Sequence, residues 1–224
     1  MCGRFALTST PEALAERFEL SEPPACRARY NVAPGQDVLV VRGAASRSRS
    51  AGFLRWGLVP AWADSPAVGS RMINARAETA ASKPAFRDAF HARRCIVPAD
   101  GFYEWHDRHP YWISGSGPFG IAGLWERWRG SDGTALESCT LLTTQANERL
   151  AALHPRMPVI LARGDEAAWL DPALPAEAAQ ALLRPPPADA LAFHPVGLRV
   201  NRIEADDPGL LERVPDPPRQ TSLF

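Results

Sequence analysis

Cys2 follows the initiator methionine directly, in the sequence Met1-Cys2-Gly3-Arg4-Phe5. Methionine aminopeptidases remove the first residue readily when the second is small, so the mature chain is expected to begin with Cys2. An N-terminal cysteine carries an α-amine and a thiol on adjacent carbons, with ordinary pKa values of about 7.7–8.0 and about 8.5. The amine can form a Schiff base with an aldehyde, and the thiol can then close a thiazolidine ring. A cysteine at position 2 can equally occur by chance, because reactivity depends on the surroundings.

Glu104 is a carboxylate within an aromatic stretch, Gly101-Phe102-Tyr103-Glu104-Trp105. The alternation of a strand places Phe102 and Glu104 on one face, and Tyr103 and Trp105 on the other. A carboxylate beside Phe102 in a poorly solvated pocket would have a raised pKa, which suits general acid–base chemistry. The alternative is a solvent-facing glutamate on an edge strand.

His154 lies between a short predicted helix and Pro155. A histidine in a structured turn can donate or accept a proton near neutral pH. The alternative is a histidine that interacts with the last carbonyl groups of the preceding helix.

The segment Asn74–Thr79 reads NARAET and precedes a predicted helix. Alternation places Asn74, Arg76 and Glu78 on one side. Asparagine can bond a carbonyl or an amine, and arginine can bind phosphate through two parallel hydrogen bonds. The alternative is a loop with a helix cap.

A proline-containing aromatic loop, Trp56-Gly57-Leu58-Val59-Pro60-Ala61-Trp62, offers two indole rings. Such rings can stack on nucleic-acid bases. Filling of the core is the alternative, above all for Trp56.

The pattern of short strands interleaved with a few helices predicts an α+β fold. It favours a single domain with a curved, largely antiparallel sheet or barrel-like core flanked by short helices. We expect this domain over residues 1–205 and a Pro- and Asp-rich tail over 206–224. Two predicted helices frame the candidate residues, at 11–20 and 78–91. The predicted strands are 37–42, 53–59, 95–97, 102–105, 111–114, 119–125, 139–143, 159–162 and 190–200.

Composition excludes several classes of protein. Apolar residues make up 46% of the 224 residues, as in soluble globular proteins. No apolar run could span a bilayer and no signal peptide opens the chain, so a cytoplasmic protein is expected. The four cysteines form no CxxC pair, which argues against a zinc site or a disulfide framework, and no metal or cofactor is expected. Cys95 and Cys139 lie in apolar stretches and are predicted core thiols. The net charge is zero, with the positive excess in the half that begins with Cys2.

Eight blocks of sequence together resemble the SRAP family (SOS response-associated peptidase), whose vertebrate relatives crosslink to abasic DNA. The blocks follow one another in the family's order over roughly residues 1–200. They are MCGRF, RYNVAPGQ (29–36), WGLVPAWA (56–63), NARAET (74–79), RRCIVPADGFYEW (93–105), AGLWE (122–126), TLLTTQAN (140–147) and LHPRMPVIL (153–161).

The resemblance implies a site and a substrate. It implies that Cys2 is the nucleophile and that Asn74, Glu104 and His154 complete the active site. It also implies a basic groove for single-stranded DNA, in which Arg76 and Arg156 hold phosphates, with Arg4 as a third. Trp62 is added as a stacking residue from the aromatic loop. The implied substrate is an abasic site, whose ring-opened deoxyribose presents an aldehyde that would be captured as a thiazolidine, shielding the lesion during replication or the SOS response.

Two other functions use the same residues. Cys2 could be the nucleophile of a self-processing peptidase, with its own amine as base, so that removal of Met1 is the self-cleavage. A noncatalytic reader of modified DNA bases is the third possibility, and its binding would survive loss of the Cys2 thiol.

The last five residues, Gln220-Thr221-Ser222-Leu223-Phe224, resemble the Gln-x-x-Leu-Phe peptide that binds the bacterial sliding clamp. A peptide at the end of a tail can reach a pocket on a partner and bury Leu223 and Phe224 there. We therefore predict that the clamp is a protein partner, bound through Gln220, Leu223 and Phe224. We also expect the protein to associate with the nucleoid during repair.

Overall fold

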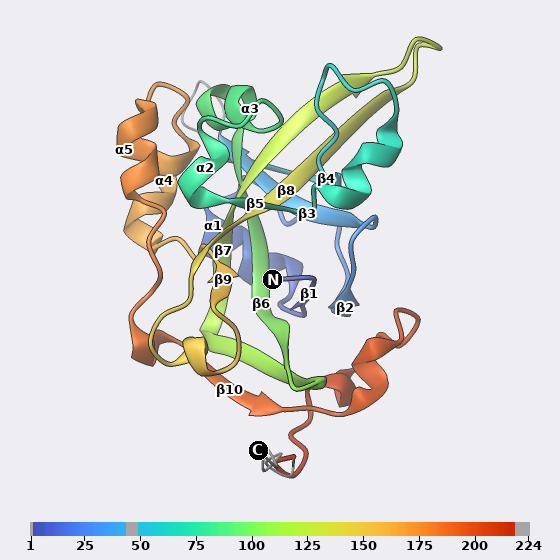
Figure 1. Ribbon diagram of the computed structural model, residues 1–224, viewed down its shortest axis with the longest axis vertical. Helices are drawn as coiled ribbons and strands as arrows, with labels where there is room; N and C mark the ends of the chain where they lie inside the picture. Colours follow the sequence, from blue (N-terminus) through green and yellow to red (C-terminus); the bar gives the residue numbers. More distant parts are fainter. Residues whose placement is uncertain (1, 44–48, 218–224) are drawn as a thin grey trace, which may run out of the picture.

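A single ten-stranded sheet forms the centre of the protein in the computed structural model, which describes residues 2–43 and 49–217 (Figure 1). The strands are β1 (Arg4–Leu7), β2 (Arg29–Val32), β3 (Asp37–Gly43), β4 (Arg49–Trp56), β5 (Asn74–Arg76), β6 (Arg94–His106), β7 (His109–Arg129), β8 (Ala135–Gln145), β9 (Arg156–Pro158) and β10 (Ala192–Pro195).

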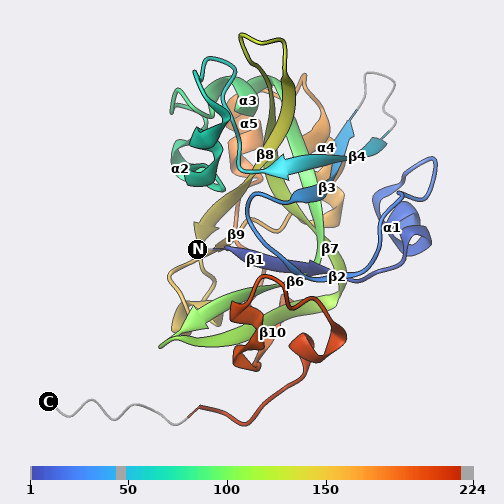
Figure 2. The ribbon, with the colours of Figure 1, turned by 90° about the vertical axis from the view of Figure 1, so that its right-hand side faces the viewer.

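The sheet closes on itself. Its strand order is β10-β7-β8-β4-β3-β6-β1-β2, and β7 also pairs with β6, so that β7, β8, β4, β3 and β6 form a ring. Strands β5 and β9 pair with β8. All pairings are antiparallel except β4–β8 and β5–β8. The predicted α+β fold with a largely antiparallel, barrel-like core is confirmed (Figure 2).

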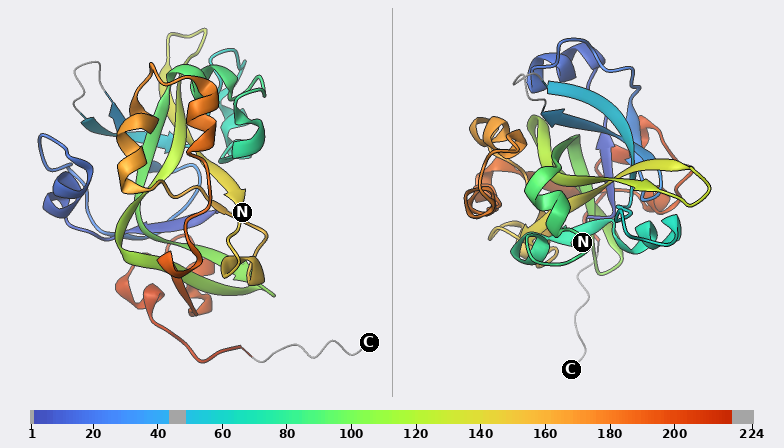
Figure 3. Two further views of the ribbon diagram at one scale, coloured as in Figure 1. Left: turned by 90° about the vertical axis from the view of Figure 1, so that its left-hand side faces the viewer. Right: turned by 90° about the horizontal axis from the view of Figure 1, so that it is seen from above.

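Short helices cover the outside of this ring. The α-helices are α1 (Pro11–Phe18), α2 (Ala77–Ala80), α3 (Arg87–Ala92), α4 (Glu166–Leu170) and α5 (Ala176–Ala181). The 3-10 helices are η1 (Pro66–Arg71), η2 (Leu150–Ala152), η3 (Arg163–Asp165), η4 (Ala188–Ala190), η5 (Leu198–Asn201) and η6 (Pro208–Leu211). Figure 3 shows α4 and α5, in orange, along one flank of the barrel. Within the described residues no helix is long and apolar enough to cross a membrane.

The interior is apolar on both sides of the sheet. One cluster inside the ring contains Cys2, Phe5, Trp56 and Phe102, and the predicted core thiols Cys95 and Cys139 are fully buried in it. The ring centroids of Phe5 and Trp56 lie 5.3 Å apart, and Trp56 is fully buried. Trp56 therefore fills the core, which was the alternative to stacking on bases. Packing at β1 therefore fixes the backbone immediately after Cys2.

Two predicted pairs of short strands are each one long strand. The segments 95–97 and 102–105 join in β6, and 111–114 and 119–125 join in β7. The two long strands keep their pairing through an irregularity in register between Ala99 and Gly101. A side chain at position 101 would collide with the ring of Trp112. This position therefore requires glycine.

The predicted helix over 78–91 is wrong as a single element. It is divided into α2 and α3 by a turn that contains Pro84. Proline lacks an N–H and disfavours helical backbone in the residue before it, so the helix cannot run through. Phe86 and Phe90 still pack into the core, as their spacing predicts.

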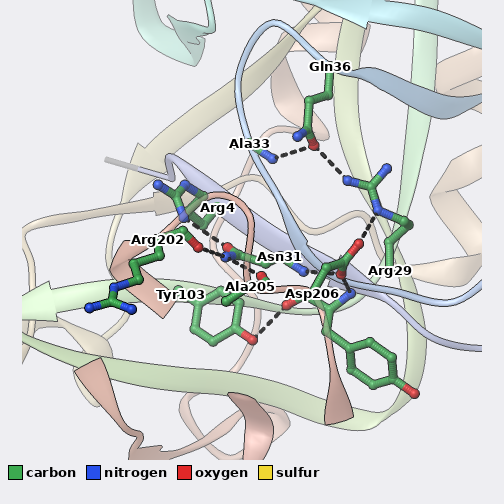
Figure 4. Close-up of polar contacts among 10 residues, drawn as sticks. Arg4, Arg29, Asn31, Ala33, Gln36, Tyr103, Arg202, Ala205 and Asp206 are labelled. Atoms are coloured by element: carbon green, nitrogen blue, oxygen red, sulfur yellow. Dashed lines mark hydrogen bonds and ion pairs between the residues drawn. The ribbon is translucent and has the colours of Figure 1, made fainter. Parts of the chain in front are cut away.

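Residues beyond the predicted domain boundary at 205 also contact the domain. Asp206 accepts hydrogen bonds from the backbone N–H groups of Tyr30 and Asn31 and pairs with Arg29 at 2.6 Å (Figure 4). Beyond it, Leu210 is buried, and the N–H of Val214 donates to Pro195. The packed domain therefore extends at least to Val214. The predicted clamp-binding residues Gln220, Leu223 and Phe224 lie outside the described residues.

Candidate active site

Strand pairing brings the start of the chain to Glu104. Strand β1 pairs with β6 so that Arg4 faces Tyr103 and Phe5 faces Phe102. Continuing that register places Gly3 opposite Glu104. The predicted alternation is confirmed, because Phe102 and Glu104 line one small pocket while Tyr103 belongs to a different cluster. Glu104 is buried, which contradicts the alternative of a solvent-facing glutamate.

Asn74 holds the backbone of Cys2. Strand β5 pairs in parallel with β8, with Asn74 next to Leu141, and this directs the amide toward the chain start. The Asn74 Nδ2 group donates to the carbonyl oxygen of Cys2 at 2.7 Å. Among the described residues, the buried Oδ1 of Asn74 has no hydrogen-bond partner. This oxygen is therefore available to a donor that enters the site.

His154 lies against Glu104, with its Nδ1 at 3.9 Å from the carboxylate Oε2. The backbone N–H of Arg156 donates to the same Nδ1 at 3.0 Å, and the Arg156 carbonyl oxygen lies at an equal 3.0 Å. Nδ1 can accept from the N–H when it carries no proton, and it can donate to the carbonyl when it carries one. The contacts at Nδ1 are therefore compatible with a proton present or absent at that nitrogen.

The Cys2 thiol is held in its neutral form. Its side chain is 0% exposed, and the S–H donates weakly to the carbonyl of Arg4 at 3.9 Å. The pKa of the Cys2 thiol is raised to about 12, mainly by burial and secondly by the negative charge of Glu104. Near neutral pH the thiolate, which is the reactive form, is scarce.

Alkylation tests this thiol. At about pH 8, iodoacetamide is expected to modify the partly exposed Cys26 well before Cys2, and the Cys2 rate should rise about tenfold per pH unit below its pKa. Glu104→Gln should accelerate the Cys2 reaction at a given pH, because loss of the negative charge lowers the pKa of the thiol. Peptide mass mapping gives both rates. Equal rates at Cys2 and Cys26 in the unaltered protein would contradict this account.

The predicted DNA-binding residues differ in whether their side chains face solvent or bond to other groups of the protein. Arg76 is exposed on β5, and the Trp62 side chain is 62% exposed in the loop after β4. Arg156 instead donates from Nη1 and Nη2 to the two carboxylate oxygens of Glu78, at 2.7 and 3.0 Å. Arg4 donates from Nη1 to Asn31 Oδ1 at 2.9 Å and to the Val200 carbonyl at 2.7 Å. Arg76 and Trp62 thus face solvent, whereas Arg4 and Arg156 are engaged by the protein.

Two residues that support the site were not predicted from the sequence. Asn31 is fully buried and binds Arg4, together with carbonyl groups near the C-terminal end of the domain (Figure 4). Glu78 holds Arg156. The available signal for Asn31 was an amide directly before the apolar pair Val32-Ala33, since a buried polar side chain needs partners.

Comparison with known proteins identifies the family. A family model described as SOS response associated peptidase (SRAP) matches residues 1–203. The chain belongs to the SRAP family. The resemblance carried by the eight sequence blocks is therefore confirmed.

Curated SRAP relatives align with nearly the whole chain. "Abasic site processing protein YoqW" of Bacillus subtilis is 40% identical over 223 residues, covering 95% of this chain and 99% of the relative. "Abasic site processing protein YedK" of Escherichia coli is 30% identical and covers 96% of this chain and 100% of the relative. "Abasic site processing protein HMCES" of Gallus gallus is 36% identical over 70% of this chain and 56% of the longer relative.

Solved structures share the SRAP fold. A protein from Bordetella bronchiseptica superposes with a TM-score of 0.77 at 31% identity, covering 88% of this chain and 100% of the other. A protein from Bacteroides thetaiotaomicron reaches a TM-score of 0.86 at 24% identity, covering 95% of this chain and 100% of the other, which supports the fold alone.

Proposed function

We propose that this protein processes abasic sites in single-stranded DNA by joining the lesion covalently to Cys2 after Met1 has been removed. The observation that carries the proposal is the gathering of Asn74, Glu104 and His154 around Cys2, with a direct bond from Asn74 to the Cys2 carbonyl. This set combines a nucleophile, an orienting amide and two groups that can transfer protons. The relatives are named abasic site processing proteins, which agrees with this substrate.

The first step is attack by the Cys2 α-amine on C1′ of the ring-opened deoxyribose. Ring opening comes before this attack: the C1′–O bond of the ring breaks, His154 protonates the sugar oxygen that leaves C1′, and the C1′ hydroxyl becomes the carbonyl as its proton passes through Glu104 back to His154. The C–N bond forms as the carbonyl π bond breaks, giving a carbinolamine, and Glu104 moves the proton from nitrogen to the departing hydroxyl, which leaves as water. Asn74 orients the amine throughout, and its open Oδ1 can accept an N–H from it.

The thiol then adds to the carbon of the Schiff base. A C–S bond forms, the C=N π electrons move to nitrogen, and the thiol proton ends on that nitrogen, giving a thiazolidine. Because burial raises the pKa of the Cys2 thiol and keeps it neutral, the amine reacts first and the thiol second. The closed ring removes the aldehyde, so β-elimination and strand cleavage are suppressed.

The exposed groups beside the site suit a single strand. Arg76 can bind a backbone phosphate, and Trp62 offers an indole face for stacking. The sugar must reach a buried nucleophile, and a duplex would resist that approach. Noncovalent binding should weaken as salt rises, because phosphate contacts release counterions.

The test is incubation with a single-stranded oligonucleotide that carries one abasic site, followed by denaturing electrophoresis and intact mass. A shifted band that is lost in Cys2→Ala and kept in Cys26→Ser is expected. Absence of any band for protein lacking Met1 would overturn the proposal. Release of a peptide with repeated turnover would favour the peptidase, and selective binding of modified oligonucleotides that survives Cys2→Ala would favour the noncatalytic reader.

We also propose that the terminal Gln220–Phe224 peptide binds the bacterial sliding clamp. The sequence supports this through Gln220, Leu223 and Phe224 in the spacing of the clamp-binding peptide. Deletion of these five residues should abolish co-purification of the clamp while leaving crosslinking to abasic DNA unchanged. Equal clamp recovery with and without the peptide would remove this partner.

A further inference from the structure

Arg156 is held by a carboxylate in the geometry of a phosphate. Nη1 and Nη2 donate in parallel to Oε1 and Oε2 of Glu78, at 2.7 and 3.0 Å. Parallel two-bond pairing is the arrangement by which arginine binds carboxylate and phosphate alike. Nη2 also donates to the carbonyl of Thr143 at 2.6 Å, with Thr143 Oγ1 at 3.2 Å. A phosphate can reach the same pair of N–H groups only if Glu78 leaves.

The sheet brings Glu78 close to both arginines that the proposed function assigns to phosphates. On β8, Thr143 lies opposite Arg76 of β5 on one side and Pro158 of β9 on the other. Glu78 is the second residue of α2, the helix that follows β5. The hydrogen bond with Arg156 is the largest cause that lowers the pKa of Glu78, and the charge of Arg76 contributes as well.

Glu78 is the more exposed partner of this pair. Its side chain is 46% exposed, whereas that of Arg156 is 18% exposed. If Glu78 turns into solvent, the bonds to Thr143 still hold the guanidinium. Glu78 is therefore not needed to orient Arg156, and its carboxylate can be replaced without disordering the arginine.

We propose that Glu78 occupies the position of a DNA phosphate in the free protein and is exchanged for that phosphate when single-stranded DNA binds. This inference rests on the proposed function, and it adds a residue that sets affinity. The carboxylate neutralises Arg156 until a correctly placed phosphate displaces it. Nucleic acid that cannot place a phosphate there gains nothing from Arg156, so Glu78 opposes indiscriminate binding.

Binding of an intact, labelled oligothymidylate, measured by fluorescence anisotropy over a range of salt, tests the exchange without any crosslinking. Glu78→Gln should tighten binding by about 1.5-fold to fivefold at low salt, the range for loss of one partly exposed ion pair. The dependence of log K on log salt should steepen by up to about 0.7, because a freed arginine releases one further counterion from a single strand.

Two controls separate this effect from charge alone. Glu16→Gln removes one exposed carboxylate from α1, away from the site, and should change affinity little. In an Arg156→Gln background, Glu78→Gln should have no more effect than Glu16→Gln. Melting temperatures establish that each variant is folded, and the glutamine amide can keep one hydrogen bond to Arg156.

Two results would overturn the exchange while leaving the proposed function intact. One is unchanged or weaker oligothymidylate binding by folded Glu78→Gln, with normal crosslinking by the unaltered protein. The other is a gain of equal size in the Arg156→Gln background. If the unaltered protein binds no single strand, the proposed function fails and the exchange fails with it.

Discussion

A chain that retains any residue in front of Cys2 should lose covalent attachment to abasic DNA by about 100-fold or more, the scale of removing an essential nucleophile. The physical reason is that the Cys2 nitrogen then belongs to a peptide bond. Its lone pair is delocalised, and it cannot form a Schiff base. The remaining thiol is buried, with a pKa of about 12, and cannot take over as first nucleophile.

The experiment uses an N-terminal tag in two versions, one resistant to a protease and one cut so that Cys2 becomes the first residue. Crosslinking should be absent with the resistant tag and restored by cutting, while both versions bind intact oligothymidylate. Cys2→Ala, which keeps a free amine, should give a Schiff base that borohydride traps but no stable crosslink. Full crosslinking by the tagged, uncut protein would show that the α-amine is not the nucleophile.

Replacement of Asn31 by leucine should lower the free energy of unfolding by about 3 kcal/mol, since a buried network of hydrogen bonds loses its centre. The Asn31 Nδ2 group lies 2.9 Å from the carbonyl oxygens of Arg202 and Ala205, and Oδ1 accepts from Arg4 (Figure 4). Leucine has a similar volume but leaves these buried groups without that partner. Crosslinking should fall as well, because Arg4 begins the strand that follows Cys2.

Urea-induced unfolding measures the stability change. Asn201→Ala is the matched control, because Asn201 is exposed and accepts one hydrogen bond, from Trp105 Nε1 at 2.9 Å. Its expected cost is below about 1 kcal/mol. If Asn31→Leu proves no more costly than Asn201→Ala, the network does not stabilise the domain as described.

The sequence drew attention to residues that the fold brings together, although it predicted several of the elements that carry them less well. Strand alternation alone oriented Glu104, because the side-chain period of a strand holds wherever one face is buried. Elements defined by local preferences, such as the helix that begins at Pro11, were also predicted well. The continuous strands β6 and β7 were not predicted. Local preference ends a strand at positions such as Gly101, but pairing between β6 and β7 keeps the strand regular there.

Long-range polar pairing was beyond the sequence. Arg4 and Arg156 read as free cations suited to phosphate, but their partners Val200 and Glu78 are brought to them only by the folded sheet. The same limitation applies to the contacts near the C-terminal end of the domain. Asp206 lies in a polar, proline-containing stretch, and nothing local indicates that its carboxylate accepts the N–H groups of Tyr30 and Asn31.

The bond between Arg4 and the Val200 carbonyl joins positions 196 residues apart, and this separation has a consequence for the order of events during synthesis. Domains acquire their contacts as the chain leaves the ribosome, at about 5–20 residues per second. Strands β1 and β2 cannot be fully secured until Val200 and Asp206 have emerged. Until then the chain start is not yet packed, whereas the Cys2 side chain is fully buried in the finished fold. An aminopeptidase that acts on the emerging chain therefore meets the chain start before the core has enclosed the Cys2 side chain.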